Sequence, residues 1–168
     1  MTEMDSAPNL VEKKALYRLL NRQMSALMEG ENHPLPNMAN MSALLYEALP
    51  DINWAGFYLC CDGGLMLGPF QGKAACIRIP MGRGVCGAAA KTCMTQLVPD
   101  VHAFPGHIAC DSASRSEIVI PLQCADGLIG VLDIDSPTQG RFDEEDQDGL
   151  QQLAKQLEAG CDWSLMTF

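Results

Sequence analysis

The chain has 168 residues, of which 48% are apolar and 19% are charged. It is therefore long and apolar enough to bury the core of one domain over residues 1–168, and a disordered chain is excluded. The 21 acidic residues exceed the 11 basic ones and give a formal net charge of -10, so the surface repels phosphate backbones and anionic lipid, and we expect neither nucleic acid nor a membrane as a partner.

The N-terminal part of the chain predicts two helices. The first is indicated by leucines that recur near the helical period, at Leu16, Leu19, Leu20 and Leu27. The second covers Asn37–Leu49, with Pro36 directly before it and its apolar residues on one side.

Six short apolar runs, each bounded by Gly, Pro or Asp, then predict strands. They are Trp54–Cys60, Leu65–Phe70, Cys76–Pro80, Gln96–Val101, Glu117–Cys124 and Leu128–Asp135. The segment Ala125-Asp126-Gly127 is typical of a hairpin turn, so the last two strands should be antiparallel.

A final helix is expected after Asp143, whose side chain can cap it, with Asp146 three residues further on. Its apolar stripe consists of Leu150, Leu153, Ala154 and Leu157. The acidic cluster at 143–146 is interpreted as a favourable interaction with the positive end of the helix rather than as a metal site. Helices, mainly antiparallel strands and a last helix together predict an α+β domain with helices packed against a sheet.

Eight cysteines are too few for a disulfide scaffold in a chain of this length, and no C-x-x-C pair occurs among them. The apolar runs are far shorter than a bilayer span, and the first twenty residues have no signal-peptide pattern. We therefore expect a cytoplasmic protein whose cysteines are thiols, most of them small buried hydrophobes.

Cys86 lies in a glycine-rich segment that runs into a helix expected to begin near Gly84. In the first turn of that helix, free backbone N–H groups and the nearby Arg83 would favour the thiolate form of Cys86. A buried structural cysteine on a tightly packed helix is an equally good interpretation of this segment.

Cys110 lies in a polar loop between two strands, after His102 and His107 and before Arg115. Polar flanks and positive neighbours are typical of an accessible, reactive thiol. A zinc site built from His102, His107 and Cys110 is the less favoured interpretation, because their spacing matches no common zinc motif.

Strand alternation puts Asp133 and Asp135 on one face of a strand, and Glu117 on the corresponding face of the preceding strand. If that face is solvated, these carboxylates are ordinary; if it is covered, they raise one another's pKa and one of them holds a proton at neutral pH. Trp54 and Tyr58 share a face of an early strand and could form an apolar wall. A reactive thiol, further thiols, carboxylates and an aromatic wall fit redox chemistry on a small zwitterion.

Six segments closely resemble the free methionine-(R)-sulfoxide reductases, which are stand-alone GAF domains. They are Gly68-Pro-Phe-Gln-Gly72, Cys76 with Ile77-Arg-Ile-Pro80, Gly82-Arg-Gly-Val-Cys-Gly87, His107-Ile-Ala-Cys110, Ser114-Arg-Ser-Glu-Ile118 and Gly130-Val-Leu-Asp-Ile-Asp-Ser136. The likeness extends from the Tyr17 region to the last helix. It implies a GAF-like domain with an antiparallel sheet of about six strands and helices on both sides.

The resemblance also implies roles for individual residues. Cys110 would be the nucleophile, Cys76 the principal resolving thiol and Cys86 a further redox cysteine. Two points stay open: whether Cys76 or Cys86 first traps the oxidised sulfur, and whether Cys86 rather than Cys110 has the leading role. The substrate pocket would consist of Trp54, Tyr58, Glu117, Asp133 and Asp135. The cysteines without a family role are interpreted as structural: Cys60, Cys61, Cys93, Cys124 and Cys161.

The reaction expected from this resemblance is the reduction of free methionine-(R)-sulfoxide. The Cys110 thiolate attacks the sulfoxide sulfur, Glu117 or Asp135 supplies a proton, and a charged Asp133 binds the substrate ammonium group. The resulting sulfenic acid condenses with Cys76, and thioredoxin, an external dithiol, reduces the disulfide. We expect no bound cofactor and no metal, and family precedent allows a homodimer.

The alternative is a non-catalytic GAF sensor that binds a cyclic nucleotide or another small effector. Two features of the sequence count against it. No output domain or linker is recognisable in these 168 residues, and an acidic pocket is a poor host for a phosphate group.

Overall fold

The computed structural model describes residues 10–167, so both ends of the domain expected over residues 1–168 lie outside the described part. The helices are α1 (Leu10–Leu27), α2 (Pro34–Ala48), α3 (Gly84–Thr92) and α4 (Glu144–Gly160). The strands are β1 (Trp54–Cys61), β2 (Gly64–Gly72), β3 (Arg78–Pro80), β4 (Gln96–Val98), β5 (Ser116–Cys124) and β6 (Gly127–Ser136). Two short 3-10 helices are η1 (Val101–Ala103) and η2 (Trp163–Leu165).

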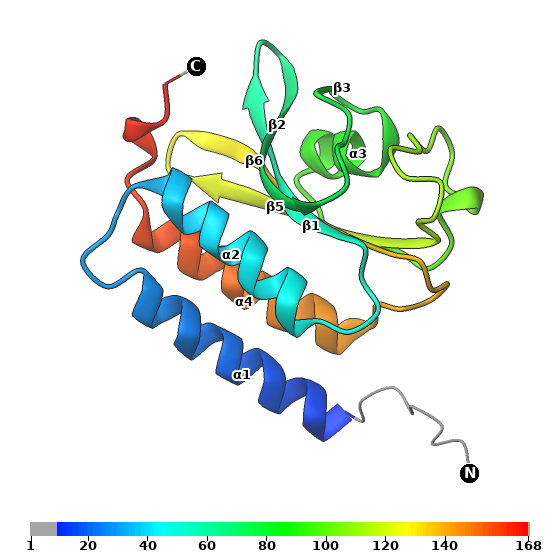
Figure 1. Cartoon of the computed structure of the whole chain (residues 1–168). Helices are drawn as coiled ribbons and strands as arrows, with labels where there is room; N and C mark the ends of the chain where they lie inside the picture. Colours follow the sequence, from blue (N-terminus) through cyan, green and yellow to red (C-terminus); the bar gives the residue numbers. More distant parts are fainter. Residues whose placement is uncertain (1–9, 168) are drawn as a thin grey trace.

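The strands form one antiparallel sheet in the order β3-β2-β1-β6-β5-β4. Helices α2 and α4 pack on one face of this sheet with α1 against them, whereas α3 covers the other face (Figure 1). Each face has its own apolar core. The predicted α+β domain with about six strands and helices on both sides is therefore confirmed, and so is the antiparallel hairpin between β5 and β6.

Strand β1 is buried along most of its length because both of its faces are covered. Ala55, Phe57 and Leu59 belong to the core beneath α2 and α4. Trp54 and Tyr58 alternate with them and belong to the core beneath α3. The shared face expected for these two aromatic residues is confirmed, and it faces α3.

Two predicted strands are shorter than expected. The run Cys76–Pro80 forms a strand only from Arg78 onward, because the segment before it is joined to another loop by a disulfide at Cys76. The run that begins at Gln96 ends as a strand at Val98. Pro99, which has no N–H to donate to a ladder, follows directly and stops it.

Two predicted helices differ in detail from the expectation. Helix α2 begins at Pro34 rather than at Asn37, since proline is tolerated in a first turn, where its missing N–H would be unpaired anyway. In α1, Leu19 and Leu27 are exposed. Of the predicted leucines, Leu20 is buried, together with Tyr17 and Met24.

The acidic cluster at the start of α4 does more than complement the helix end. Asp143 and Asp146 form a capping box. The carboxylate of Asp146 is also buried, where it accepts hydrogen bonds from Lys13 Nζ at 2.8 Å, Arg141 at 3.1 Å and the Tyr17 hydroxyl at 2.8 Å. The cluster thus joins α1 to α4 through a buried ion-pair network, in addition to the helix-end effect that was expected.

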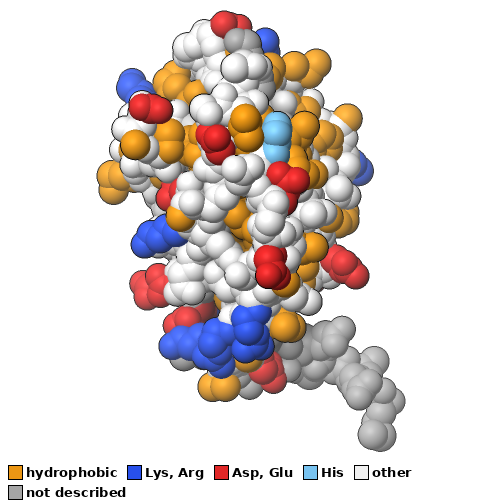
Figure 2. Space-filling model, turned by 90° about the vertical axis from the view of Figure 1, so that its left-hand side faces the viewer, with side chains coloured by type: hydrophobic (Ala, Val, Ile, Leu, Met, Phe, Trp, Pro, Cys, Tyr) orange, Lys and Arg blue, Asp and Glu red, His pale blue; other side chains and the backbone are white. Residues whose placement is uncertain are grey.

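Charge is distributed unevenly over the surface. On the face shown in Figure 2, the largest group of Lys and Arg side chains lies at the lower end, where α1 lies, and acidic side chains are spread over the whole face. Helix α1 carries four basic residues, Lys13, Lys14, Arg18 and Arg22. Within residues 10–167, no helix combines the length and the apolar character needed to cross a membrane.

Candidate active site

Three predicted carboxylates meet on the sheet face that α3 covers. Glu117 on β5 lies opposite Asp135 on β6, and Asp135 lies opposite Trp54 on β1. Asp133 lies one row further along, opposite Gly56. Because strand residues two apart share a face, the register alone assembles these side chains into one pocket wall.

Burial decides between the two interpretations of this face that the sequence left open. The segments 73–76 and 107–114 line the pocket together with the start of α3. Glu117 and Asp133 are buried, and Asp135 is half-buried. Burial raises the pKa of each of these carboxyl groups well above its ordinary value, and the neighbouring carboxyl groups raise it further. The face is covered, and burial shifts these groups toward their protonated forms.

Asp133 was expected to stay charged, but burial and its neighbours oppose ionisation of its carboxyl group in the substrate-free protein. Its pKa is raised by burial first and by the Glu117 carboxyl next. Its Oδ1 atom is buried and has no hydrogen-bond partner among residues 10–167. The free oxygen of Asp133 can accept a hydrogen bond from a cationic donor, and the positive charge of that donor would favour ionisation of the Asp133 carboxyl group.

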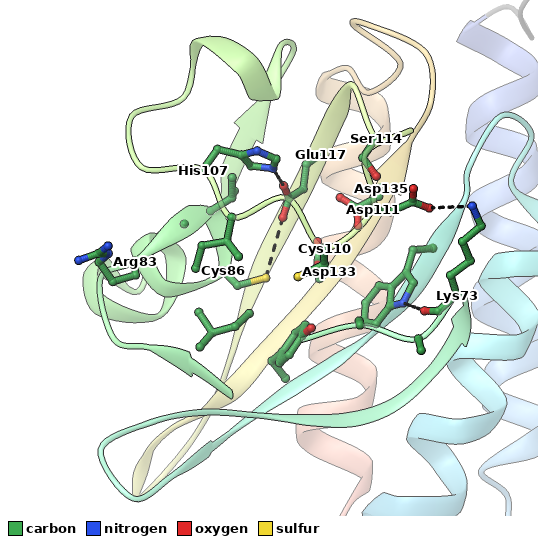
Figure 3. Close-up of a pocket in the computed structure, with 18 residues that line it drawn as sticks. Lys73, Arg83, Cys86, His107, Cys110, Asp111, Ser114, Glu117, Asp133 and Asp135 are labelled. Carbon is green, nitrogen blue, oxygen red and sulfur yellow. Dashed lines mark hydrogen bonds and ion pairs between the residues drawn. The ribbon is translucent and has the colours of Figure 1, made fainter. Parts of the chain in front are cut away.

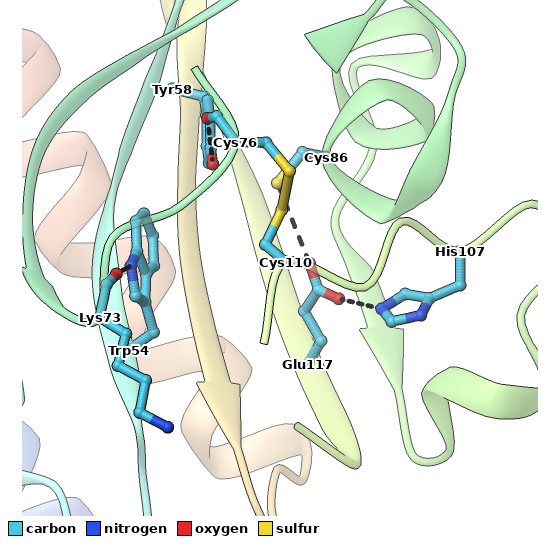
Figure 4. Close-up of a disulfide and its surroundings, with 8 residues drawn as sticks. All are labelled: Trp54, Tyr58, Lys73, Cys76, Cys86, His107, Cys110 and Glu117. Atoms are coloured by element: carbon cyan, nitrogen blue, oxygen red, sulfur yellow. Dashed lines mark hydrogen bonds and ion pairs between the residues drawn. A yellow bond between two sulfur atoms is a disulfide. The ribbon is translucent and has the colours of Figure 1, made fainter. Parts of the chain in front are cut away.

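The aromatic wall also holds one of the covering segments. Trp54 stacks on Tyr58, with ring centroids 5.8 Å apart. The indole Nε1 of Trp54 donates to the carbonyl oxygen of Lys73 at 3.1 Å, and the Tyr58 hydroxyl donates to the carbonyl oxygen of Cys76 at 3.0 Å (Figure 4). The two aromatic side chains thus fix segment 73–76 over the pocket.

Cys76 and Cys110 are joined by a disulfide at the mouth of this pocket (Figure 4). They are 34 positions apart in the chain, and their Cα atoms are 5.9 Å apart. Cys110 is exposed in its loop, and Cys76 is half-buried. The predicted polar loop thus brings an accessible sulfur atom next to a second sulfur atom.

The Cys110 loop is anchored by residues that the sequence analysis missed. Asn53, directly before β1, donates from Nδ2 to Asp111 Oδ2 at 3.2 Å and to Ser114 Oγ at 3.1 Å. Lys73 Nζ lies 3.9 Å from Asp111 Oδ2 (Figure 3). Asn53 lies one position before the predicted strand that begins at Trp54, and this adjacency is the only signal in the sequence that could have pointed to it.

Cys86 lies deep in the pocket as a neutral thiol, contrary to the interpretation as an activated thiolate. It is buried at the start of α3, with Sγ 3.9 Å from Glu117 Oε1. Burial, followed by Asp133 and Glu117, raises the pKa of this thiol well above its ordinary value. Arg83 is exposed and its guanidinium group points away from the sulfur (Figure 3), so it does not offset these effects.

Of the cations expected beside Cys110, His102 is exposed and pairs with Asp100. Arg115 is also exposed. His107 Nε2 instead lies 3.6 Å from Glu117 Oε2 (Figure 3). Burial lowers the pKa of His107, so its ring favours the neutral form and can exchange a proton with the Glu117 carboxyl.

The zinc site considered for His102, His107 and Cys110 does not form. Cys110 is in a disulfide, and within the described part of the chain a different set brings potential metal ligands together. That set is Cys86, Glu117 and Asp133, with ligand atoms within 4.8 Å of one another.

Comparison with known proteins agrees with the fold. The GAF domain family matches residues 16–160. The free methionine-R-sulfoxide reductase of Escherichia coli is 60% identical over 148 residues, which are 88% of this chain and 90% of that protein.

Two solved structures of such enzymes with substrate are also similar. The Staphylococcus aureus complex is 46% identical with a TM-score of 0.85, and the match covers 95% of this chain and 100% of that one. The Neisseria meningitidis complex is 46% identical with a TM-score of 0.86, covering 95% and 94%.

Proposed function

The chain belongs to the GAF domain family and, within it, to the free methionine-(R)-sulfoxide reductases, and on this premise we propose that it reduces free methionine-(R)-sulfoxide to methionine by thiol chemistry. The observation that carries the proposal is the Cys76–Cys110 disulfide at the mouth of a pocket lined by buried carboxyl groups. A sensor that only binds an effector has no need of this pair.

The first step is attack of the Cys110 thiolate on the sulfoxide sulfur. Cys110 is the favoured nucleophile because it is exposed at the pocket mouth, whereas Cys86 is buried beside two carboxyl groups that oppose its ionisation. The sulfoxide oxygen passes to the cysteine sulfur, methionine leaves, and Cys110 becomes a sulfenic acid.

Protonation of the sulfoxide oxygen must accompany this step, and Glu117 is our first candidate for the donor. It is buried, it favours its protonated form, and it lies beside His107, which can restore its proton from solvent. Asp135, opposite Glu117 on the next strand, is the second candidate.

The remaining pocket residues bind the amino acid. Asp133, with its unpartnered Oδ1, is assigned to the substrate ammonium group, whose charge favours the carboxylate. Trp54 and Tyr58 form the apolar wall for the methyl end of the substrate. A pocket that binds the free amine excludes a methionine within a peptide.

The catalytic cycle closes through the resolving thiol. The sulfenic acid of Cys110 condenses with the Cys76 thiol to give the disulfide and water. In sum, one sulfoxide and two thiols give methionine, one disulfide and one water. We propose that thioredoxin reduces the disulfide and that the protein acts in the cytoplasm, where a homodimer is an allowed assembly. The proposed reaction requires no bound cofactor or metal.

The test is a thioredoxin-coupled assay that compares both epimers of free methionine sulfoxide with a peptide containing methionine sulfoxide. We expect turnover of the free (R)-epimer alone. Without reductant, one equivalent of sulfoxide should consume two thiols per chain. Turnover of the peptide at the same rate, or binding of the free sulfoxide without thiol loss, would contradict the proposal.

A further inference from the structure

The pocket interior holds a second arrangement of ligand-type atoms besides the disulfide. A sulfur atom of Cys86 and one carboxyl oxygen each of Glu117 and Asp133 lie within 4.8 Å of one another, and all three residues are buried. They come from three separate elements, α3, β5 and β6, so the fold itself brings them together. Cysteine, glutamate and aspartate are all zinc ligands, and side-chain shifts from this spacing would bring each ligand atom to about 2.0–2.3 Å from one ion.

The basic side chain beside these buried carboxyl groups is His107, whose Nε2 lies 3.6 Å from Glu117 Oε2, and burial lowers the pKa of its ring. The Asp133 side chain, which is 5% exposed, lines the pocket and has an unpartnered Oδ1. The pocket-lining cations lie at the rim, where Lys73 is mostly exposed and 3.9 Å from Asp111. Arg83 points away from the cluster (Figure 3). A cation that entered the pocket would meet the unpartnered Oδ1 of Asp133 and would displace protons from the groups around it.

We propose that Cys86, Glu117 and Asp133 bind one Zn²⁺ ion. A single thiolate with two carboxylates suits Zn²⁺ and disfavours Mg²⁺ and Ca²⁺, which prefer sites built from oxygen alone. Binding releases the thiol proton and any carboxyl protons, and water fills the fourth ligand position. No electron is transferred, so the step requires no oxidant or reductant.

The site is independent of the two cysteines assigned to turnover. Cys86 is a free thiol in the structure that contains the Cys76–Cys110 disulfide. The three ligand residues are thus close together in the oxidised protein, in which Cys76 and Cys110 are bridged and cannot bind a metal ion as thiolates. Zinc binding to the oxidised chain therefore reports on this cluster rather than on the reactive pair.

The test is a zinc titration of the full chain with the Cys76–Cys110 disulfide formed, in competition with a chromophoric chelator. We expect one Zn²⁺ per chain and no competition from Mg²⁺. Cys86→Ser and Asp133→Asn should each weaken binding by at least about tenfold. The matched control is Cys124→Ser, which removes a half-buried free cysteine at the hairpin end of β5, outside the cluster, and it should bind zinc as the wild type does.

A spectroscopic readout on the wild type keeps the test valid if a pocket variant does not fold. Co²⁺ added to the oxidised protein should produce a thiolate-to-metal charge-transfer band that Zn²⁺ abolishes and that Cys124→Ser retains. Absence of the band, absence of stoichiometric zinc, or unchanged affinity in folded Cys86→Ser would each overturn the proposal.

Zinc in this position would occupy the pocket assigned to the substrate. We expect Zn²⁺ to inhibit sulfoxide reduction in competition with the free sulfoxide, and this consequence alone rests on the proposed function. The chelator titration contains no substrate, so failure of the zinc site and failure of the reductase activity are separate outcomes.

Discussion

The Sγ atom of Cys86 lies 3.9 Å from Oε1 of Glu117, although the two residues are 31 positions apart. Helix N-termini favour thiolates, and Cys86 occupies the first turn of α3. Burial beside Glu117 and Asp133 nevertheless raises the pKa of this thiol. The desolvation of the pocket therefore outweighs the helix-end effect at Cys86, and the nucleophile proposed above is the exposed Cys110 at the pocket mouth.

Substitution of the two bridged cysteines should separate the two thiol steps. We expect Cys110→Ser to abolish turnover and disulfide formation, because the nucleophile is lost. In Cys76→Ser, one equivalent of sulfoxide should leave a sulfenic acid on Cys110, which a dimedone adduct detected by mass spectrometry would identify. Cys124→Ser should behave as the wild type. Full turnover by Cys110→Ser would refute the assignment of the nucleophile.

Glu117→Gln should slow the chemical step, because an amide has no acidic proton to give to the sulfoxide oxygen. We expect kcat to fall about 100-fold, the lower end of the range for a general acid. In the wild type, kcat should fall as pH rises through the raised pKa of Glu117, where the donor form disappears. A pH profile of steady-state rates measures both effects. If Asp135→Asn caused the large loss and Glu117→Gln did not, Asp135 would be the donor.

The buried carboxyl groups should also make stability depend on pH. In the unfolded chain, Asp and Glu lose their protons near their ordinary pKa values of 3.8 and 4.5, whereas in the native protein the buried carboxyl groups keep their protons to higher pH. The contribution of these carboxyl groups to the free energy of unfolding therefore decreases as pH rises from their ordinary pKa values to their raised pKa values in the native protein. One unit of pKa shift corresponds to about 1.4 kcal/mol.

Urea unfolding of the wild type and of Glu117→Gln between about pH 5 and pH 8 measures this effect. The variant should gain stability relative to the wild type as pH rises, because it lacks one group that must ionise inside the pocket. The exposed-site variant Glu144→Gln is the control and should keep a constant difference from the wild type. A constant difference for Glu117→Gln as well would contradict the buried, protonated state.

Loss of the Asp146 carboxylate should destabilise the fold without touching the pocket. Asp146 is 1% exposed and pairs with the ammonium group of Lys13 and the guanidinium group of Arg141. Without it, the largely buried Arg141 side chain would lose this carboxylate partner, and Lys13 would keep only Asp143. We expect Asp146→Ala to lower the free energy of unfolding by about 3–5 kcal/mol. Glu144→Ala, on an exposed part of the same first turn, should change it by less than about 0.5 kcal/mol. Chemical denaturation measures both values.

The sequence by itself determined which side chains share a sheet face. Period-two alternation is a local property of a strand, so it assigned Asp133 and Asp135 to one side of their strand and Trp54 and Tyr58 to one side of theirs. Local rules likewise predicted the hairpin between β5 and β6 and the cap at Asp143. They were less reliable at element ends, as the early start of α2 at Pro34 shows.

Only the tertiary structure decided what covers that face and which groups meet there. The contact of Cys76 with Cys110 spans 34 positions, and the positions of Asn53 and His107 depend on how a loop folds over the sheet. The ionisation of Cys86 also depends on burial, a property of the whole fold. Periodicity and capping are local along the chain, whereas desolvation and long-range contacts arise only once separate elements have packed together.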